Sequence, residues 1–284
     1  MSSQKGQIGR MKPPGRVPLD SKAAMTRDGQ GACPSSQCRM AAMDRVEDHY
    51  RNFLAPSYSW MSGGFESKLA ENVQFFASIL GKPITHTTAL DLGCGSGFQS
   101  AALLSLGFDV VAVDSSEILI AELRERTADP KLTTLIADFR HASMYAESGP
   151  FQVAVCMGDT LVHLATLEEV LQVLRDVFAA LIPQGWLVLG FRDLTQELKG
   201  IDRAIPVRLD EHQLMSTFLE FEPEHVVVND MMFVQQDGRW TMSKSCYRKL
   251  RLAPAVVIEH LERIGFHSIE LKSERGFCTI VARR

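Results

Sequence analysis

Three glycines stand at alternate positions after a short apolar run, since residues 89–97 read Ala-Leu-Asp-Leu-Gly-Cys-Gly-Ser-Gly. Alternate glycines let a ligand approach the backbone where a Cβ atom would clash. The helix expected next presents unpaired N–H groups and the positive end of its dipole. Such a turn can hold the carboxylate and the ribose of a nucleoside ligand. Asp114 follows Gly93 by 21 residues, close to the spacing of a ribose-binding acid.

The spacing of the glycines separates two kinds of cofactor. A dinucleotide site reads G-x-G-x-x-G, whereas this turn reads G-x-G-x-G and has Asp91 two residues before its first glycine. The segment resembles motif I of the class I S-adenosylmethionine-dependent methyltransferases, and the resemblance covers roughly residues 85–191. It implies S-adenosylmethionine as the cofactor and a Rossmann-like sheet.

The resemblance also implies a cofactor contact for several residues of this sequence. Asp91 would orient the methionine amino end, Asp114 would accept from the ribose hydroxyls, and Asp138 would accept from the adenine amine. Phe139 would pack on the adenine face. The other members of the expected cofactor-binding set are Gly93, Gly95, Gly97, Met157, Tyr58 and Trp60.

A glycine-rich turn can also be purely structural. Here, however, Asp91, Asp114 and Asp138 all fall at the ends of expected strands. These ends meet on one edge of a parallel sheet, which is where ligands bind in this architecture. The agreement between the glycine spacing and the three acids therefore favours the cofactor site.

The methyl acceptor is expected beside the fourth strand, where residues 156–164 read Cys-Met-Gly-Asp-Thr-Leu-Val-His-Leu. The Asp/Asn-Pro-Pro-aromatic motif that DNA and RNA amino-methyltransferases carry at this place is missing. The segment instead resembles the Gly-Asn-Ser-x-x-His-Leu loop of the glycine N-methyltransferase family. Looser similarity to that family extends to residues 58–64, 191–193 and 247–250. It implies that Arg192 grips a substrate carboxylate.

One departure from that family concerns its asparagine, which is Asp159 here. An anion at this place would favour a cationic or donor-rich acceptor, or would remove its proton, so glycine itself is not the expected substrate. The expected catalytic set is Asp159, Arg192 and His163. Arg192 can alternatively form an ion pair with Asp159 or Asp193, and His163 can pack or cap a helix rather than act as a base.

Aromatic residues near the amino terminus are further candidates for the wall of the pocket. Tyr50, Tyr58 and Trp60 could hold the sulfonium by cation–π contact, and plain core packing is the alternative for each of them. Cys94 and Cys156 flank the expected cofactor site, and apolar packing is their expected role. The six cysteines form no C-x-x-C pair and no cluster with zinc spacing, so we expect no metal, and reduced thiols in the cytosol.

The elements that must position these residues follow an α/β pattern, with helical and strand periods alternating from Arg45 onward. The stretch 193–250 breaks this pattern, because it alternates like antiparallel strands and contains the hairpin signal Asp237-Gly238. We expect a Rossmann-like methyltransferase sheet with an antiparallel β insert after the fifth strand. Ser115 or Ser116, and Thr166, are expected helix caps. Helices are expected over residues 43–55, 65–80, 98–106, 116–128, 167–181 and 254–264. Strands are expected over residues 88–92, 109–113, 132–137, 151–156, 186–191, 214–222, 225–234, 240–249, 267–273 and 276–282.

Charge divides the 284 residues, whose net charge is −4, into two parts. Residues 1–42 hold seven basic and two acidic side chains, a net charge of +5, which leaves −9 for the rest. This leader has few large apolar residues, and we expect it to be disordered. The methyltransferase domain is expected over 43–284, with an N-terminal helical lid at 43–82. No apolar run is long enough for a membrane span, and the charge argues against a dedicated nucleic-acid binder.

The sequence therefore predicts a methyltransferase that uses S-adenosylmethionine and acts on a small polar acceptor, chiefly an amine or an amino-acid-like nitrogen. One alternative is a small thiol or hydroxyl as acceptor. Another is a macromolecule-directed methyltransferase or a regulator that binds S-adenosylmethionine and recruits a partner through its basic leader. The sequence does not identify the acceptor or the oligomeric state. It also leaves open whether translation starts at Met1, Met40 or Met43.

Overall fold

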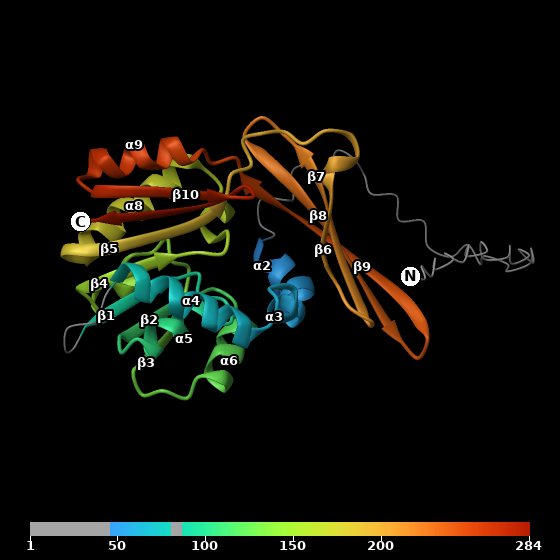
Figure 1. Ribbon diagram of the computed structural model, residues 1–284, viewed down its shortest axis with the longest axis horizontal. Coiled ribbons are helices and arrows are strands. Elements are labelled where there is room, and N and C mark those ends of the chain that lie inside the picture. The colour runs from blue at the N-terminus through green and yellow to red at the C-terminus, as the bar shows by residue number, and fades with distance from the viewer. Residues whose placement is uncertain (1–45, 81–86) are drawn as a thin grey trace, which may run out of the picture. The chain divides into compact units, whose positions relative to one another are not determined.

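A computed structural model of the chain describes residues 46–80 and 87–284 (Figure 1). The leader expected over 1–42 lies outside the described residues, as do the first residues of the helix expected over 43–55. In the described part, no helix is both long and apolar enough to cross a membrane.

The larger of two sheets has seven strands in the order β10-β11-β5-β4-β1-β2-β3. The strands β1 to β5 pair in parallel, while β11 runs antiparallel to β5, and β10 runs antiparallel to β11. The Rossmann-like fold expected from the sequence is confirmed. The strands are β1 (Thr88–Leu92), β2 (Asp109–Asp114), β3 (Leu132–Ile136), β4 (Phe151–Cys156), β5 (Leu181–Arg192), β10 (His267–Glu274) and β11 (Phe277–Arg283).

Helices cover both faces of this sheet, and consecutive side chains of a strand enter two different cores. Leu90 of β1 packs in one core with side chains of α8 and α9, whereas its neighbour Ala89 packs in the other with side chains of α4, α5 and α6. Burial on both faces explains why these strands are continuous apolar runs. The helices are α4 (Phe65–Leu80), α5 (Phe98–Ser105), α6 (Glu117–Arg126), α7 (Ser143–Ala146), α8 (Leu167–Ala180) and α9 (Pro254–Ile264).

Two of these helices begin at the caps expected from the sequence. Ser116 Oγ accepts from the backbone N–H of Leu119 at 3.4 Å, and Thr166 Oγ1 accepts from that of Glu169 at 3.2 Å. The Glu169 carboxylate turns back to the N–H of Ala165 at 2.8 Å. These contacts fix the starts of α6 and α8, which both lie near the carboxyl edge of the parallel strands.

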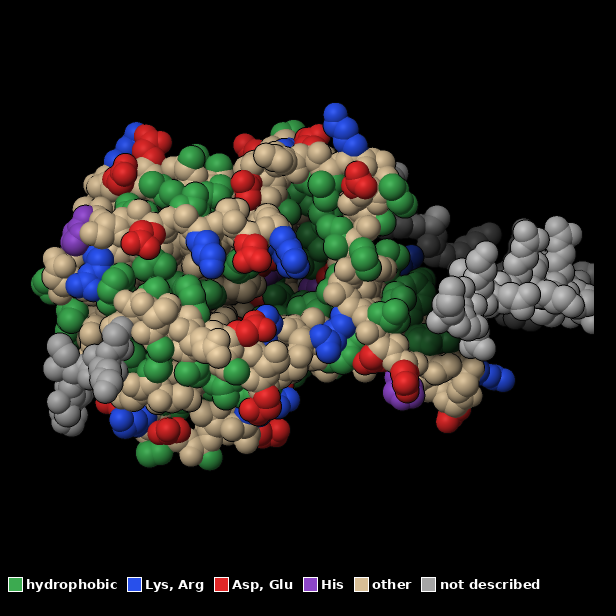
Figure 2. All heavy atoms as spheres, in the orientation of Figure 1, with side chains coloured by type: hydrophobic (Ala, Val, Ile, Leu, Met, Phe, Trp, Pro, Cys, Tyr) green, Lys and Arg blue, Asp and Glu red, His purple; other side chains and the backbone are tan. Residues whose placement is uncertain are grey.

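The insert forms a separate four-stranded antiparallel sheet in the order β6-β7-β8-β9. Its hairpin at Asp237-Gly238 has positive φ at both residues, as a two-residue turn requires. The strands expected over 214–222, 225–234 and 240–249 are confirmed as β7, β8 and β9. The sequence did not predict β6, which contains Pro206, and its pairing with β7 shifts register after that proline. Hydrophobic side chains gather over this sheet in Figure 2, with Leu209 and Met242 among the exposed ones. Its strands are β6 (Ala204–Leu209), β7 (Gln213–Phe221), β8 (His225–Gln236) and β9 (Arg239–Leu250).

The segment before α4 is a series of short helical pieces, which confirms the helical stretch expected over 43–55 in its described part. It runs from α2 (Val46–His49) through a π-helical turn (Tyr50–Leu54) and a 3₁₀ turn (Ala55–Ser57) to α3 (Tyr58–Met61). Polar contacts hold it on the insert, since His49 Nε2 lies 3.3 Å from Asp230 Oδ2 of β8 and both side chains are buried.

Candidate functional site

A cavity of about 330 Å³ lies at the carboxyl edge of β1 and β2. The core of the fold contributes the glycine turn, Asp114 and the loops after β3 and β4, while the N-terminal segment contributes two tyrosines. The lining includes Gly93, Gly95, Asp114, Phe139, Thr160, His163, Tyr50 and Tyr58. The structure therefore brings together, in one cavity, residues that are far apart in the sequence.

The glycine turn has a left-handed backbone, with φ of 67° at Gly93, 54° at Gly95 and 88° at Gly97. A Cβ atom at Gly93 would meet Thr160, and one at Gly97 would meet Leu123 of α6, each at 2.1 Å from the nearest atom. Only glycine therefore allows the turn to lie this close to its neighbours. Gly93 and Gly95 line the cavity, whereas Gly97 serves the packing of α5 against α6.

Asp114 closes β2 and holds the turn from the side. Its Oδ2 accepts from the backbone N–H of Gly95 and its Oδ1 from that of Ser116, both at 2.8 Å. Burial raises the pKa of this carboxyl, and the two hydrogen bonds oppose the rise. Because Asp114 also lines the cavity, it stands where a carboxylate could accept from ribose hydroxyls.

Asp91 lies behind the turn rather than in the cavity wall. Its side chain is almost fully buried, and its Oδ2 accepts from Ser100 Oγ of α5 at 2.6 Å. Burial raises the pKa of Asp91 to about 7, although the hydrogen bond from Ser100 opposes the rise. The structure therefore gives Asp91 a contact that ties β1 to α5, and does not place it against the methionine end of a ligand.

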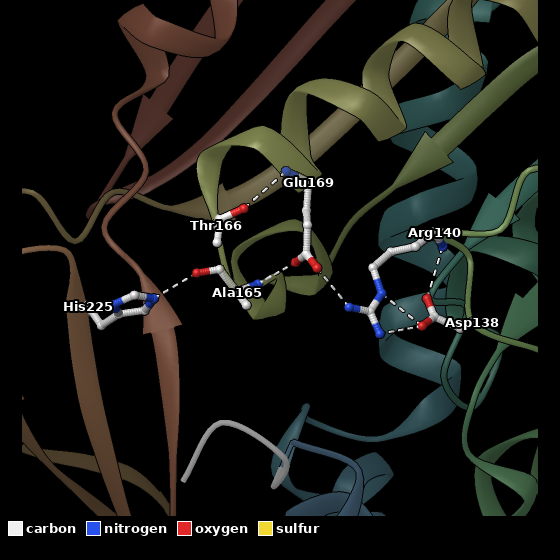
Figure 3. Close-up of polar contacts among 6 residues, drawn as sticks. All are labelled: Asp138, Arg140, Ala165, Thr166, Glu169 and His225. Atoms are coloured by element: carbon white, nitrogen blue, oxygen red, sulfur yellow. Dashed lines mark hydrogen bonds and ion pairs between the residues drawn. The ribbon is translucent and has the colours of Figure 1, made fainter. Parts of the chain in front are cut away.

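The loop after β3 contains Asp138 and Phe139, which were both expected to contact adenine. Phe139 lines the cavity, as a ring that packs on adenine would. Asp138 does not line it, because its carboxylate is engaged by Arg140 through the backbone N–H and the guanidinium (Figure 3). Of the pair expected to contact adenine, only Phe139 is in the wall.

The three remaining candidates for the cofactor set also differ. Tyr58 lines the cavity beside Gly95. Trp60 turns away from it, because its Nε1–H donates to Asp210 Oδ2 at 2.5 Å and Arg208 stacks on its ring. Met157 packs against the hydrophobic core under the sheet. A direct cofactor contact is therefore supported for Tyr58 and not for Trp60 or Met157.

His163 and Tyr50 form a half-buried pair in the cavity wall, with Nε2 and Oη 3.3 Å apart. Burial, assisted by the nearby positive charge of Lys249, lowers the pKa of His163 to about 3. The imidazole is therefore neutral near pH 7, and it is a weak base. Burial raises the pKa of Tyr50, so its hydroxyl keeps its proton.

Asp159 lies just outside the cavity, in an ion cluster with two cations. Its Oδ2 lies 2.7 Å from Lys249 Nζ and 3.3 Å from Arg192 Nε, and its Oδ1 accepts from the Arg192 backbone N–H at 2.6 Å. Burial opposes ionisation, but Lys249 and Arg192 outweigh it and lower the pKa of Asp159. The carboxylate is thus already compensated and is a poor proton acceptor. The ion pair considered for Arg192 is present.

Lys249 is the residue of this cluster that sequence reasoning missed. It comes from the far end of the insert, on β9, and its side chain is nearly buried. The only signal was the Tyr-Arg-Lys-Leu similarity at residues 247–250. Nothing in the local sequence indicates that this lysine meets Asp159, which lies 90 positions earlier.

The buried thiols behave as apolar side chains. Burial raises the pKa of both Cys94 and Cys156, so neither is a thiolate near pH 7. Within the described ranges, no group of three or more His, Cys, Asp or Glu side chains is arranged to hold a metal ion.

Sequence comparison supports the reading of the glycine turn. The family described as Methyltransferase domain matches residues 89–185. A glycine/sarcosine N-methyltransferase of Parasynechococcus marenigrum (strain WH8102) is 33% identical over 115 residues, covering 40% of each chain. Another, of Aphanothece halophytica, is 29% identical over 154 residues, covering 52% of this chain and 57% of that protein. The chain spans about half the length of the curated relatives it matches.

Solved structures show the same fold. The CcbJ methyltransferase of Streptomyces caelestis has a TM-score of 0.65 at 19% identity, covering 85% of this chain and 97% of that one. CalS10 of Micromonospora echinaspora, an amino pentose methyltransferase, has a TM-score of 0.65 at 16% identity, covering 81% and 95%.

The fold, the glycine turn and the family match together define the class. Residues 89–185 match a methyltransferase domain, and the chain has the fold of solved S-adenosylmethionine-dependent methyltransferases. The cavity fits the nucleoside part of S-adenosylmethionine, since the glycine turn, the Asp114 carboxylate and the Phe139 ring all line it. The turn leaves little room for a side chain, because a Cβ on Gly95 would lie 3.3 Å from Tyr58.

Proposed function

We propose that the protein transfers the methyl group of S-adenosylmethionine to a nitrogen atom of a small polar acceptor, an amine or an amino-acid-like compound. The observation that carries this proposal is the ion cluster of Asp159, Arg192 and Lys249 beside the cofactor cavity. The relatives named as glycine/sarcosine N-methyltransferases support it.

The turn of Gly93 and Gly95, together with Asp114 and Phe139, would hold the cofactor. S-adenosylmethionine supplies an electrophilic methyl group on a positively charged sulfur atom. Tyr50 and Tyr58 would cover the cavity from the N-terminal segment, and their rings exclude water from it. The aromatic faces are also suited to a cationic centre.

The protein's contribution to the reaction is positioning and desolvation rather than strong base catalysis. His163 is neutral with a low pKa, and Asp159 is held as a compensated carboxylate. The acceptor nitrogen must therefore arrive uncharged. It forms the new bond to carbon as the bond from carbon to sulfur breaks, and it then loses one proton to water.

The ion cluster favours an acceptor that bears a carboxylate. One acid faces two cations, so the cluster has an excess positive charge, in contrast to the free anion that the sequence suggested at Asp159. More than half of the Arg192 side chain is exposed, with 57% of its surface accessible, so its outer N–H groups can donate to the two oxygens of a carboxylate. This charge balance makes an amino-acid-like acceptor compatible with Asp159.

We also propose a cytosolic location and a catalytic domain that does not need the leader for turnover. The thiol content supports this location, because Cys94, Cys156 and Cys278 are free cysteines. A variant that begins at Met43 tests the second point, since it should keep full turnover of the small acceptor.

The acceptor class is tested by incubating the enzyme with S-adenosylmethionine and panels of amines, amino acids, thiols and hydroxyl compounds, and by measuring which masses rise by one methyl group. Amines or amino acids should be labelled. Thiols or hydroxyl compounds alone would support the alternative acceptor. With the labelled acceptor, Arg192→Lys should raise KM and leave cofactor affinity nearly unchanged, because lysine lacks the planar fork of arginine.

A further inference from the structure

A chain of polar contacts starts at the carboxyl end of β3 (Figure 3). Asp138 Oδ1 accepts from the backbone N–H of Arg140 at 2.9 Å, and Oδ2 accepts from Nε at 2.8 Å and from Nη2 at 2.5 Å. One arginine thus supplies three N–H groups to one carboxylate, two of them from the guanidinium to the same oxygen, and such charge-assisted contacts are strong. Most of the hydrogen-bonding capacity of Asp138 is therefore used within the protein.

The same guanidinium continues the chain to the start of α8. Arg140 Nη1 donates to Glu169 Oε1 at 2.9 Å, and Glu169 Oε2 accepts from the N–H of Ala165 at 2.8 Å. The carbonyl of Ala165 lies 2.9 Å from Nε2 of His225, on β8 of the insert. The contacts thus connect the β3 loop, the capped end of α8 and the insert, as Figure 3 shows.

Phe139 lies between Asp138 and Arg140 in the sequence. Its neighbours Asp138 and Arg140 bond to each other, while Phe139 itself lines the cofactor cavity and packs against the main core. Burial opposes the ionisation of Asp138, but the hydrogen bonds and charge of Arg140 outweigh it and lower its pKa. Asp138 is therefore a carboxylate near pH 7, as its contacts with the Arg140 guanidinium require.

We propose that Asp138, Arg140 and Glu169 form a clamp that positions Phe139 against the purine of the cofactor. In this clamp Arg140 is a positioning residue, and the carboxylate of Asp138 serves Arg140 rather than the adenine amine. The proposal concerns the cofactor side of the site, so it holds whichever acceptor the enzyme uses.

The clamp can be distinguished from an ordinary surface ion pair. Exposed pairs contribute little to stability, and the Arg140 side chain is 44% exposed. Loss of the clamp should therefore change the free energy of unfolding only slightly. It should change ligand affinity more, because a loop that is free to move must be ordered again when the purine binds.

The first test measures the affinity of the full chain for S-adenosylhomocysteine by calorimetry. Arg140→Met should weaken binding about tenfold, comparable to the loss of one charge-assisted hydrogen bond. Arg140→Lys should fall between that variant and the natural protein. The control is Arg263→Met on α9, which breaks an exposed pair with Glu259 and should leave the affinity unchanged. An Arg140→Met protein that keeps its affinity within about twofold would overturn the proposal, whatever its melting temperature.

The second test separates the clamp from direct recognition of adenine by comparing adenosine with inosine, which lacks the exocyclic amine. Asp138→Asn should weaken both nucleosides by the same factor, so that their affinity ratio stays constant. If the preference for adenosine over inosine were lost in Asp138→Asn, the carboxylate would contact the exocyclic amine of adenine, and the proposal would be overturned. Glu169→Gln combined with Arg140→Met should be no worse than Arg140→Met alone, since both act through the same contact.

Discussion

The Lys249 ammonium of the insert lies 2.7 Å from the Asp159 carboxylate of the Rossmann-like core, and both side chains are nearly buried. This contact joins the end of β9 to the loop after β4, beside the cavity. Arg192 completes the arrangement at 3.3 Å. A buried carboxylate depends on such partners, because removing one of them leaves charge without compensation in a region of low dielectric constant.

Lys249→Met should therefore destabilise the protein by about 3 kcal/mol. The double variant Asp159→Asn with Lys249→Met removes both buried charges and should recover most of that loss. Urea unfolding of the single and double variants measures both values. If the losses in the double variant simply add, the two side chains are not coupled in the way the structure indicates.

Asp114→Ala should weaken the binding of S-adenosylhomocysteine by about 1.5–3 kcal/mol, since it removes a charged hydrogen-bond acceptor from the cavity wall. It should also loosen the turn, because Asp114 Oδ2 holds the Gly95 N–H. Calorimetry on Asp114→Ala and Asp114→Asn checks this. Affinity that does not change in either variant would remove Asp114 from the cofactor site.

Gly97→Ala should destabilise the protein far more than Gly64→Ala. Both glycines have positive φ, 88° and 95°, so alanine is strained at each. A Cβ at position 97 would in addition come 2.1 Å from Leu123, whereas at position 64 nothing lies within 4 Å. Strain alone costs on the order of 1–2 kcal/mol. If thermal unfolding showed the same loss of stability in both variants, that result would contradict the close approach of Leu123 on α6 to the turn.

The pH dependence of stability should contain two opposite contributions. Burial raises the pKa of Asp91 to about 7, so this group binds a proton more tightly in the folded state, and stability falls as pH rises from about 4 to 7. Burial lowers the pKa of His163 to about 3, so stability falls as pH drops from about 6.5 to 3.

Two variants separate these contributions. In Asp91→Asn, unfolding in urea at pH 5 and pH 7 should lose the decline in stability toward pH 7. In His163→Gln, the decline toward low pH should diminish instead. Each group contributes a slope of at most about 1.4 kcal/mol per pH unit. Variants whose pH profiles match that of the natural protein would contradict the burial of these two groups.

The sequence predicted the parallel sheet and the glycine turn well, because both depend on local patterns. The apolar runs of β1 and β4 and the glycine spacing are signals within a few residues. The sequence could not show that Asp138 would be bonded by Arg140, or that Trp60 would turn to Asp210, since these choices depend on three-dimensional neighbours. The pairing of Lys249 with Asp159 is a contact between distant segments for the same reason.

Methyl transfer to a small nitrogen acceptor can be tested by labelling with S-adenosylmethionine that carries an isotopic methyl group. The full chain is incubated with a cell extract, and the label is then measured separately in the small-molecule, protein and RNA fractions. We expect label on the nitrogen of one or a few small amines or amino acids, with slower transfer by Arg192→Lys. Label in protein or RNA with none in the small-molecule fraction would contradict this expectation.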